Sequence, residues 1–561
     1  NVFEKVRNIP EFKIQTLGPL EFKNVEEPID VYALANEGFP VPKVSQLKGK
    51  LKSRKSVLQR LTQPWVIAAV LLVAVGVFWL VSTKGSGSSK SQVTANELSA
   101  LEKSIAVLPF RDLSETADQG YFSDGVAEEI LNALSQLEGL KVIGRTSSFS
   151  FKNANISVGE IASQLNVSTV LDGSVRKVDN KVRISAQLIR ASDESQIWTR
   201  SFNFELDDIF AIQNEIALNV AEKFRLSILE EERDQLVIRP TTSQIGYDLY
   251  LQGVALYQRD PTNPEVQRYF MRAIKLDPYF GEAWEGLAYS KAWLAFGLAT
   301  EPKAAFARTL QLLEMAENMN GKMKFPSLEF AIKTWHVWDW KDLQEDVQQR
   351  VYDDSQFSEH EYANYYSLLG DVEKADYFRT LSLERDPLSP IFHYAKVRDY
   401  IFQRKYNLAL DALEQNLKQF PKAGFHYLKA DILFYMGRYP EAYRAIEAAA
   451  EQEDANRYPH FYKGLRIACL TYMNQEATAQ EEMKLLLKER ETSFVDPLIL
   501  VLPSWLLGDK EQALDFLELA YEKKSVLLST AVVSPYFDLI RNEDRFKAIF
   551  LQINFPNTVL G

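Results

Sequence analysis

An uninterrupted apolar run covers residues 65–81 and separates a short N-terminal part of the chain from a long C-terminal part. A helix of this length extends about 26 Å, close to the ~30 Å hydrocarbon core of a bilayer. Trp65 and Trp79 stand near its ends, where indole rings favour the headgroup region, and Gly76 lies inside it. The pattern predicts a transmembrane helix over residues 64–83. A buried helix of a soluble core is the alternative.

The charges on either side of the run predict its orientation. Seven Lys or Arg residues and no acidic residue occur between positions 43 and 60, whereas Lys84 and Lys90 follow the run. Because basic residues favour the cytoplasmic side, residues 37–63 should form a cytoplasmic linker. We expect a single-pass protein of a bacterial inner membrane, with the residues after about 84 in the periplasm. The Gly/Ser-rich start of residues 84–102 indicates a flexible linker.

Alternating and periodic apolar positions over residues 103–235 predict an α/β domain. Helical spacing is present at 126–137, behind Ser123 or Asp124 as a cap, and again at 158–165 and 209–220. The short apolar segments predict strands at 104–110, 141–144, 170–178, 182–189 and 196–204.

Residues that typically end or start helices recur about every 34 residues over 243–555, and this pattern predicts an all-α solenoid. Pro387 and Pro421 are one such period apart, and the step from a glycine into a new helix occurs at 437–442 and 508–513. Residues 295–360 depart from the pattern, so the pattern sets no register there. The concave face of such an array is expected to bind a protein or peptide. The predicted fold class is thus multidomain, α/β plus all-α.

The charge is distributed unevenly along the chain, which bears on the kind of partner it can bind. Residues 1–84 hold 12 Lys or Arg against 7 Asp or Glu, a net charge of +5. Because the whole chain has a net charge of −12, the remaining residues carry −17. The large C-terminal part is therefore expected to have no nucleic-acid partner. Cys469 is the single cysteine, so no intrachain disulfide can form.

The α/β region offers few reactive groups. Residues 104–235 contain no His or Cys, which excludes Ser-His and Cys-His chemistry there. Gly173, inside a strand, indicates either a β-bulge or the close approach of a ligand. Four aspartates could converge on a cation, although aspartates beside turns and caps more often form local hydrogen bonds: Asp112, Asp118, Asp124 and Asp172.

One repeat position is histidine four times. His360, His393, His426 and His460 are 33, 33 and 34 residues apart. A ladder of imidazoles could sense pH or bind a metal. Packed helices lie about 8–10 Å apart, however, so successive repeats cannot easily share one ion, and aromatic-like packing in the first helix of each repeat is the alternative.

Residues 1–36 carry a family resemblance. Leu17, Gly18, Phe22, Lys23, Asn24, Val25, Pro28, Val31 and Tyr32 resemble the closing segment of class III nucleotide cyclase domains. The resemblance implies a homodimeric parent that cyclises ATP or GTP with Mg or Mn. It also places the catalytic residues ahead of Asn1, so we expect no catalytic, cofactor or metal residue in this chain. Lys23 is a candidate to approach a nucleotide phosphate, with a solvated strand lysine as the alternative.

A second resemblance covers about 120 residues. The strings SIAVLPF, YFSDGVAEEILNALSQL and VLDGSVRKV resemble the TolB-like domain that precedes tetratricopeptide repeats in bacterial membrane signalling proteins. Together the resemblances imply the membrane-anchor and sensory or protein-interaction portion of a class III cyclase, with an adenylate cyclase as the expected parent protein. A membrane-tethered periplasmic tetratricopeptide scaffold without a catalytic role is the alternative.

Overall fold

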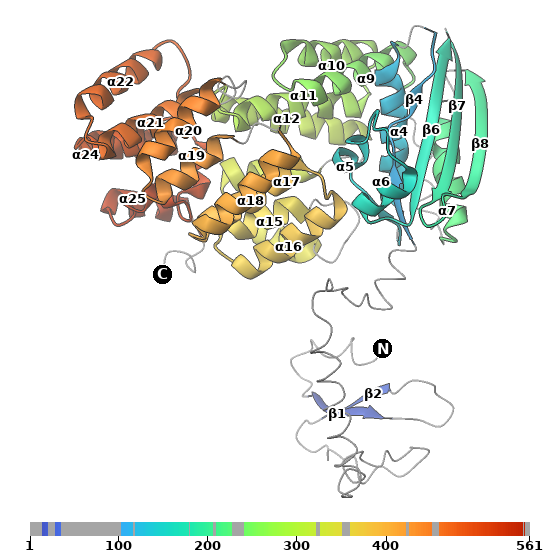
Figure 1. The fold of residues 1–561 in the computed structure, drawn as a ribbon, viewed down its shortest axis with the longest axis horizontal. Helices are drawn as coiled ribbons and strands as arrows, with labels where there is room; N and C mark the ends of the chain where they lie inside the picture. Colours follow the sequence, from blue (N-terminus) through green and yellow to red (C-terminus); the bar gives the residue numbers. More distant parts are fainter. Residues whose placement is uncertain are drawn as a thin grey trace, which may run out of the picture. The chain divides into compact units, whose positions relative to one another are not determined.

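The computed structural model describes residues 14–20, 29–34, 103–115, 118–137, 139–178, 180–205, 209–226, 240–320, 326–350, 359–421, 426–451, 459–553 and 555. It forms two compact units, residues 1–92 and 93–561 (Figure 1). In the first unit, β1 (Ile14–Leu20) pairs antiparallel with β2 (Ile29–Leu34). Lys23 and the expected transmembrane helix with Trp65, Gly76 and Trp79 lie outside the described residues, as do the linkers 37–63 and 84–102.

The second unit begins with a mixed sheet. Its strand order is β5-β3-β6-β7-β8, and β4 also pairs with β6. Pairing is parallel between β3 and its neighbours β5 and β6, and antiparallel from β6 to β8. The strands are β3 (Ser104–Val107), β4 (Arg111–Asp112), β5 (Lys141–Val142), β6 (Thr169–Val178), β7 (Lys181–Arg190) and β8 (Gln196–Glu205).

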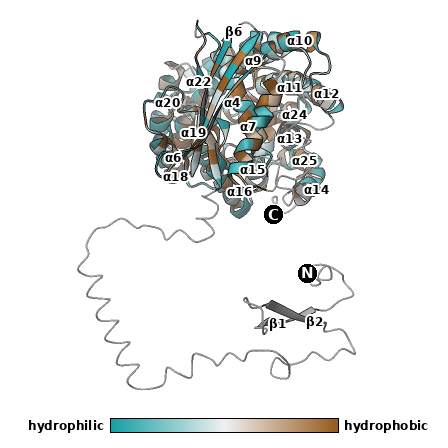
Figure 2. Cartoon of the chain, turned by 90° about the vertical axis from the view of Figure 1, so that its right-hand side faces the viewer, coloured by the Kyte–Doolittle hydropathy of each residue, from teal (hydrophilic) through white to brown (hydrophobic). Residues whose placement is uncertain are grey.

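Helices cover both faces of this sheet because β3 is apolar on both sides. Ile105 and Val107 belong to the core that α4 and α7 form, whereas Ala106 and Leu108 pack with residues of α6. Figure 2 shows hydrophilic and hydrophobic positions side by side on α7, as expected for a half-buried helix. The helices are α4 (Gly120–Ser135), α5 (Arg145–Phe149), α6 (Val158–Leu165) and α7 (Ile209–Lys223).

Two sequence-based expectations in this region are wrong. Helix α4 begins at Gly120, not after Ser123 or Asp124, because Asp112 accepts a hydrogen bond from the Gln119 amide at 2.8 Å and fixes the chain there. No bulge occurs at Gly173, where the β6–β7 register runs without a shift. A Cβ at Gly173 would lie 2.8 Å from the Phe110 ring, so the glycine permits a close approach of this side chain.

A helical array follows the sheet domain. Consecutive helices pack as hairpins in the pairs α9/α10, α11/α12, α15/α16, α17/α18, α19/α20, α21/α22 and α23/α24. Gly370, Gly437 and Gly508 sit at the turn inside three of these pairs with φ of +72°, +74° and +89°, the left-handed conformation that ends a helix.

The helices of the array have the following bounds. They are α9 (Gln244–Arg259), α10 (Pro264–Leu276), α11 (Gly281–Phe296), α12 (Pro302–Asn320), α13 (Pro326–Ile332), the π-helix η4 (Lys333–Val337), α14 (Trp340–Arg350), α15 (Glu359–Leu368), α16 (Val372–Arg385), α17 (Pro390–Phe402), α18 (Tyr406–Gln419), α19 (His426–Tyr435), α20 (Tyr439–Glu451), α21 (Pro459–Tyr472), α22 (Glu476–Glu489), α23 (Leu498–Leu506), α24 (Lys510–Glu522), the 3₁₀ helices η6 (Val526–Thr530) and η7 (Pro535–Phe537), and α25 (Asp544–Gln552).

The array curves back on itself, so that its last helices meet an earlier part. Lys523 Nζ lies 2.9 Å from Glu301 Oε1, and His336 Nδ1 lies 2.8 Å from the Lys524 carbonyl oxygen. His336 also contacts the Phe306 ring. The irregular stretch around η4 is therefore where the C-terminal helices close against the array.

The sheet domain is joined to the array at two separate places. At α9, Asp248 accepts hydrogen bonds from Tyr121 Oη at 2.9 Å and Lys177 Nζ at 2.8 Å. Near the start of α5, Ser147 donates its amide N–H to Asp386 Oδ1 at 2.7 Å, and the Gly144 amide donates to the Arg385 carbonyl at 2.7 Å. We call this second contact the α5 joint. Because the two attachments lie on different repeats, the sheet domain bridges part of the array.

Among the residues that the structure describes, none of the helices is both long enough and apolar enough to cross a membrane.

Candidate functional site

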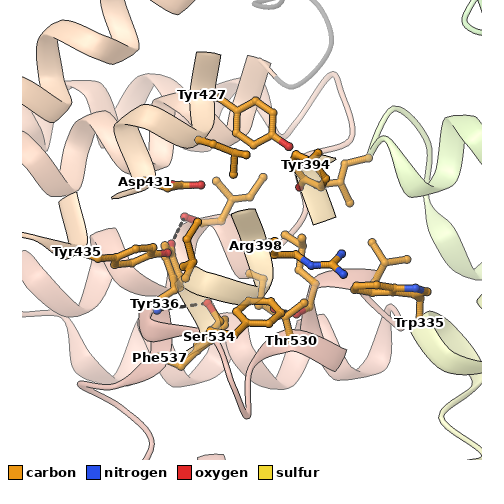
Figure 3. Close-up of a pocket in the computed structure, with 18 of the residues that line it drawn as sticks. Trp335, Tyr394, Arg398, Tyr427, Asp431, Tyr435, Thr530, Ser534, Tyr536 and Phe537 are labelled. Carbon is orange, nitrogen blue, oxygen red and sulfur yellow. Dashed lines mark hydrogen bonds between the residues drawn. The ribbon is translucent and has the colours of Figure 1, made fainter. Parts of the chain in front are cut away.

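The array contains a partly open cavity of about 340 Å³, which we call the inner cavity (Figure 3). Its walls come from α17 and α19 on one side and from α23, η6 and η7 on another, with Trp335 of η4 and the end of α11 completing them. Pockets that hold small ligands begin at about this size.

Two neighbouring helices supply matched stripes to the cavity. Residues 394, 398 and 402 of α17 and residues 427, 431 and 435 of α19 line it. Within each helix the spacing is four residues, which places the side chains on one face. Between the helices the spacing is 33 residues, so the stripes occupy equivalent positions of successive repeats. Four of the six are Tyr or Phe, and the middle pair is Arg398 and Asp431.

Asp431 lies on one side of the cavity and Trp335 on the other, with Arg398 between them in the view of Figure 3. Asp431 is 7% exposed, and its Oδ1 atom has no hydrogen-bond partner among the described residues. Burial raises the pKa of this carboxyl to about 8. Below that pH the empty cavity thus holds a neutral carboxylic acid.

Arg398 has neutral partners. One of its terminal nitrogens donates to Asn364 Oδ1 at 2.6 Å, and its guanidinium carbon lies 5.2 Å from the centre of the Trp335 ring and 5.7 Å from that of Phe402. Its Nε atom is buried without a partner among the described residues. No carboxylate in the described part of the chain forms an ion pair with it.

A buried polar cluster fixes Asn364, and through it Arg398. Arg379 is fully buried and donates to Asp399 Oδ2 and to Asn364 Oδ1, both at 2.9 Å. Its third contact is His360 Nδ1 at 2.8 Å. Asp399 forms an ion pair with Arg379. The buried carboxyl of Glu361, whose pKa burial raises to about 7, interacts electrostatically with both arginines, but it forms no ion pair with Arg398.

The other polar groups of the cavity have partners inside the protein. Thr530 Oγ1 donates to the Leu527 carbonyl at 2.7 Å, and Tyr536 Oη donates to the Ile499 carbonyl at 3.2 Å. The remaining wall is mainly aromatic and aliphatic. Asp431 and Arg398 are thus the two charged residues of the inner cavity that have capacity left for a ligand.

The four repeat histidines lie in the first turn of α15, α17, α19 and α21. His360 stacks on Phe392 with ring centres 4.6 Å apart, and His393 Nε2 lies 2.8 Å from the Pro387 carbonyl oxygen. His460 Nδ1 lies 3.6 Å from Glu489. Burial lowers the pKa of His360 well below its usual value, and burial also lowers that of His460. The ladder position immediately precedes the cavity-lining positions 394 and 427.

The four aspartates of the sheet domain have separate partners, and two of them, Asp112 and Asp118, form the local hydrogen bonds that the sequence suggests. Asp112 accepts from two backbone amides, Asp118 from Gln119 Nε2 at 3.0 Å, and Asp172 from Gln187 Nε2 at 2.8 Å. Asp124 pairs with Lys152. Within the described ranges, no group of three or more His, Cys, Asp or Glu residues is arranged to hold a metal ion.

Sequence reasoning missed the inner cavity. Its signal was present, since Tyr394, Arg398 and Phe402 recur 33 residues later as Tyr427, Asp431 and Tyr435. The far wall carries no such signal, because it comes from Trp335 and from η6 and η7, which reach the cavity only through the closure of the array.

Comparisons with known proteins relate the chain to regulators and to a cyclase. Residues 101–219 match the family described as HilA/YgeH-like transcriptional regulator, second domain. The chain is 33% identical over 215 residues to putative adenylate cyclase 3 of Rhizobium meliloti (strain 1021). That similarity covers 35% of this chain and 37% of the relative, so the chain spans well under half of the relative's length.

Two solved structures show a weaker likeness. A human IFIT1 dimer with PPP-AAAA has a TM-score of 0.35 at 18% identity and covers 56% of this chain and 88% of its own. The tetratricopeptide domain of P58(IPK) has a TM-score of 0.17 at 13% identity and covers 62% of this chain and 92% of its own. At TM-scores this low the likeness carries no conclusion. What stands is a mixed-sheet domain joined to a helical-hairpin array, in a chain related to a protein named as a cyclase.

Proposed function

We propose that this chain is the membrane-anchor and sensory portion of a class III nucleotide cyclase, and that the whole protein produces cyclic AMP in signal transduction. The observation that carries the proposal is the 33% identity over 215 residues to a protein named as an adenylate cyclase. The resemblance of segment 1–36 to a cyclase end also supports it. In this proposal the whole protein uses ATP with Mg or Mn and acts as a homodimer through its cyclase domain.

The geometry supports a sensory role for the second unit. The chain passes from the apolar run and its linker directly into β3, an inner strand of the sheet. The sheet domain in turn contacts α9 and, through the α5 joint, the loop before α17. Since α17 lines the inner cavity, a ligand that favours one placement of this helix would also favour one placement of the sheet domain.

The proposal includes a location. We place the sheet domain, which we regard as TolB-like, and the array in the periplasm, with the cyclase segment in the cytoplasm and residues 64–83 crossing the inner membrane. The basic stretch 43–60 supports this orientation. The match of 101–219 to a domain of transcriptional regulators supports a signalling role for this module. Binding of a protein or peptide to the array is part of the same proposal.

Two assays test the proposal. Alkaline phosphatase fused after Gly85 should be active in bacteria, whereas the same enzyme fused after Lys43 should be inactive; equal activity of both fusions would contradict the topology. The whole protein should also restore cyclic AMP to a bacterium that lacks its own cyclase. If abundant protein produced no cyclic AMP, a tethered scaffold would replace the cyclase proposal.

A further inference from the structure

We propose that the inner cavity binds a small zwitterion, a free amino acid or a related molecule that carries one ammonium group, one carboxylate and an apolar body. The inference rests on two groups of opposite charge that share one cavity, each without an ionic partner among the described residues.

The Asp431 side of the cavity suits an ammonium group. An isolated buried carboxyl is costly to ionise, and a cation that donates hydrogen bonds to it removes that cost. Tyr427, Tyr435 and Tyr536 line the cavity with Asp431. The faces of aromatic rings attract cations, so these rings add to the pull of the carboxylate.

The Arg398 side suits a carboxylate. The guanidinium carries a full charge, yet its described contacts are an amide oxygen and two aromatic rings. Its one described side-chain hydrogen bond, to Asn364, uses a single terminal nitrogen, so the guanidinium keeps donor capacity for an incoming oxygen. A carboxylate accepts two parallel hydrogen bonds from a guanidinium, which is the strongest form of this pairing.

One ligand can satisfy both groups. Arg398 and Asp431 occupy equivalent positions on α17 and α19, yet the two do not form an ion pair with each other. A zwitterion placed between them satisfies both at once, and a cavity of about 340 Å³ leaves room for an apolar body against Phe296, Leu298 and Trp335. A purely anionic or purely cationic ligand would leave one of the two groups unpaired.

The first experiment is isothermal titration of the purified full chain at pH 8. The probes are L-phenylalanine, L-leucine and 6-aminohexanoate, with phenethylamine and 3-phenylpropionate as analogues that carry a single charge. We expect at least one zwitterion to bind with a Kd below about 1 mM, and the two analogues to bind at least tenfold more weakly than L-phenylalanine if the α-amino acid is the ligand. Preference for 6-aminohexanoate would identify a longer spacing of the charges. No binding of any zwitterion up to 10 mM, on the order of the weakest specific binding worth measuring, would overturn the proposal.

Variants assign the two charges. Asp431→Asn should weaken zwitterion binding at least tenfold and leave 3-phenylpropionate binding unchanged. Arg398→Gln should also weaken zwitterion binding at least tenfold, but it should leave phenethylamine binding unchanged. Asp376→Asn is the matched control, because Asp376 is exposed and pairs with Lys396 outside the cavity. If both cavity variants unfold at the wild-type temperature and bind the zwitterion with wild-type affinity, the proposal fails.

The pH dependence gives a second readout. An ammonium group requires an ionised Asp431, so wild-type affinity should rise about tenfold per unit from pH 6 toward pH 8 and then level off, since burial raises the pKa of this carboxyl to about 8. The other titratable groups that face Asp431 stay neutral over this range, because burial raises the pKa values of Tyr394, Tyr435, Tyr536 and Cys469. Burial raises the pKa of Glu361, which interacts with Arg398, to about 7; its ionisation would weaken the hold of Arg398 on a carboxylate and so opposes the expected rise. A flat profile would contradict the assignment of Asp431. Binding is measured on the chain itself, so its failure would leave the cyclase proposal untouched.

Discussion

The buried carboxyl of Asp431 can bind a ligand, but its burial lowers the stability of the folded protein. Burial raises the pKa of its carboxyl to about 8, far above the ordinary value near 3.9. Between these two pH values the folded protein retains a proton that the unfolded chain has lost. The contribution of Asp431 to stability therefore falls as the pH rises through this window.

Asp431→Asn removes this titration while keeping the shape of the side chain. We expect the variant to gain stability relative to wild type as the pH rises from 5 to 8, by about 1–3 kcal/mol across the interval. Chemical denaturation at both pH values measures the difference. Asp376→Asn, on the exposed surface, should show no such trend, and a pH-independent difference for Asp431→Asn would show that the carboxyl is ionised throughout.

Gly173 is a residue that permits one specific contact. A Cβ there would lie 2.8 Å from the Phe110 ring and 2.8 Å from the Ser185 carbonyl oxygen. Gly173→Ala should therefore destabilise the sheet domain by about 1–3 kcal/mol, seen as a lower midpoint of thermal unfolding. Gly120→Ala is the control, because nothing lies within 4 Å of an added Cβ at Gly120. Equal midpoints for the two variants would contradict the packing explanation.

The surroundings of these residues could not be predicted from the sequence alone. A glycine inside a strand indicates that something is unusual there, but the ring of Phe110 approaches it only because β4 continues from β3 along β6. In the same way, the stripes of α17 and α19 can be read from the 33-residue spacing, whereas the missing partners of Arg398 and Asp431 depend on the whole environment.

At the scale of elements, the α5 joint couples the sheet domain to the repeat that begins with α17. Asp386 accepts the Ser147 amide and also the Ser147 hydroxyl, and that hydroxyl in turn accepts the Leu388 amide at 2.7 Å. Both Ser147 and Asp386 are buried. Removal of the acceptor would leave a buried N–H unsatisfied, which is more costly than the loss of an ordinary hydrogen bond.

Asp386→Ala should cost about 1–3 kcal/mol of stability and increase amide hydrogen exchange in α5 and at the start of α17. Asp386→Asn retains an oxygen that can accept both bonds, so most of the protection should return. Asp376→Ala serves as an exposed control with a change within about 0.5 kcal/mol. Unchanged exchange in Asp386→Ala would mean that the joint does not hold the two parts together.

Elements with strong local signals were predicted well. The helix at 158–165 and the strands around residue 180 follow from periodicity and turn residues, and both have the expected bounds within a residue or two. The stretch from 295 to 360 had no clear register. It contains the π-helix η4, whose His336 and Trp335 are held by Phe306, Lys524 and Arg398, so its conformation depends on contacts distant in sequence.

In the whole molecule, the array that holds the cavity contacts the sheet domain at two places, and the first strand of that domain, β3, follows the apolar run along the chain. A ligand in the cavity can influence a cyclase only if it binds two arrangements of this body with different affinity. The α5 joint is the described contact through which α17 and the sheet domain would share such a preference.

The most direct test is the cyclic AMP produced by the whole protein in a bacterium without its own cyclase. We predict that the wild-type protein raises cyclic AMP above background and that Asp431→Asn and Asp386→Ala each change its output at least about twofold, at equal protein abundance in the membrane fraction, while Asp376→Asn does not. Background cyclic AMP from an abundant, membrane-bound wild-type protein would contradict the account, and so would identical output from all four proteins.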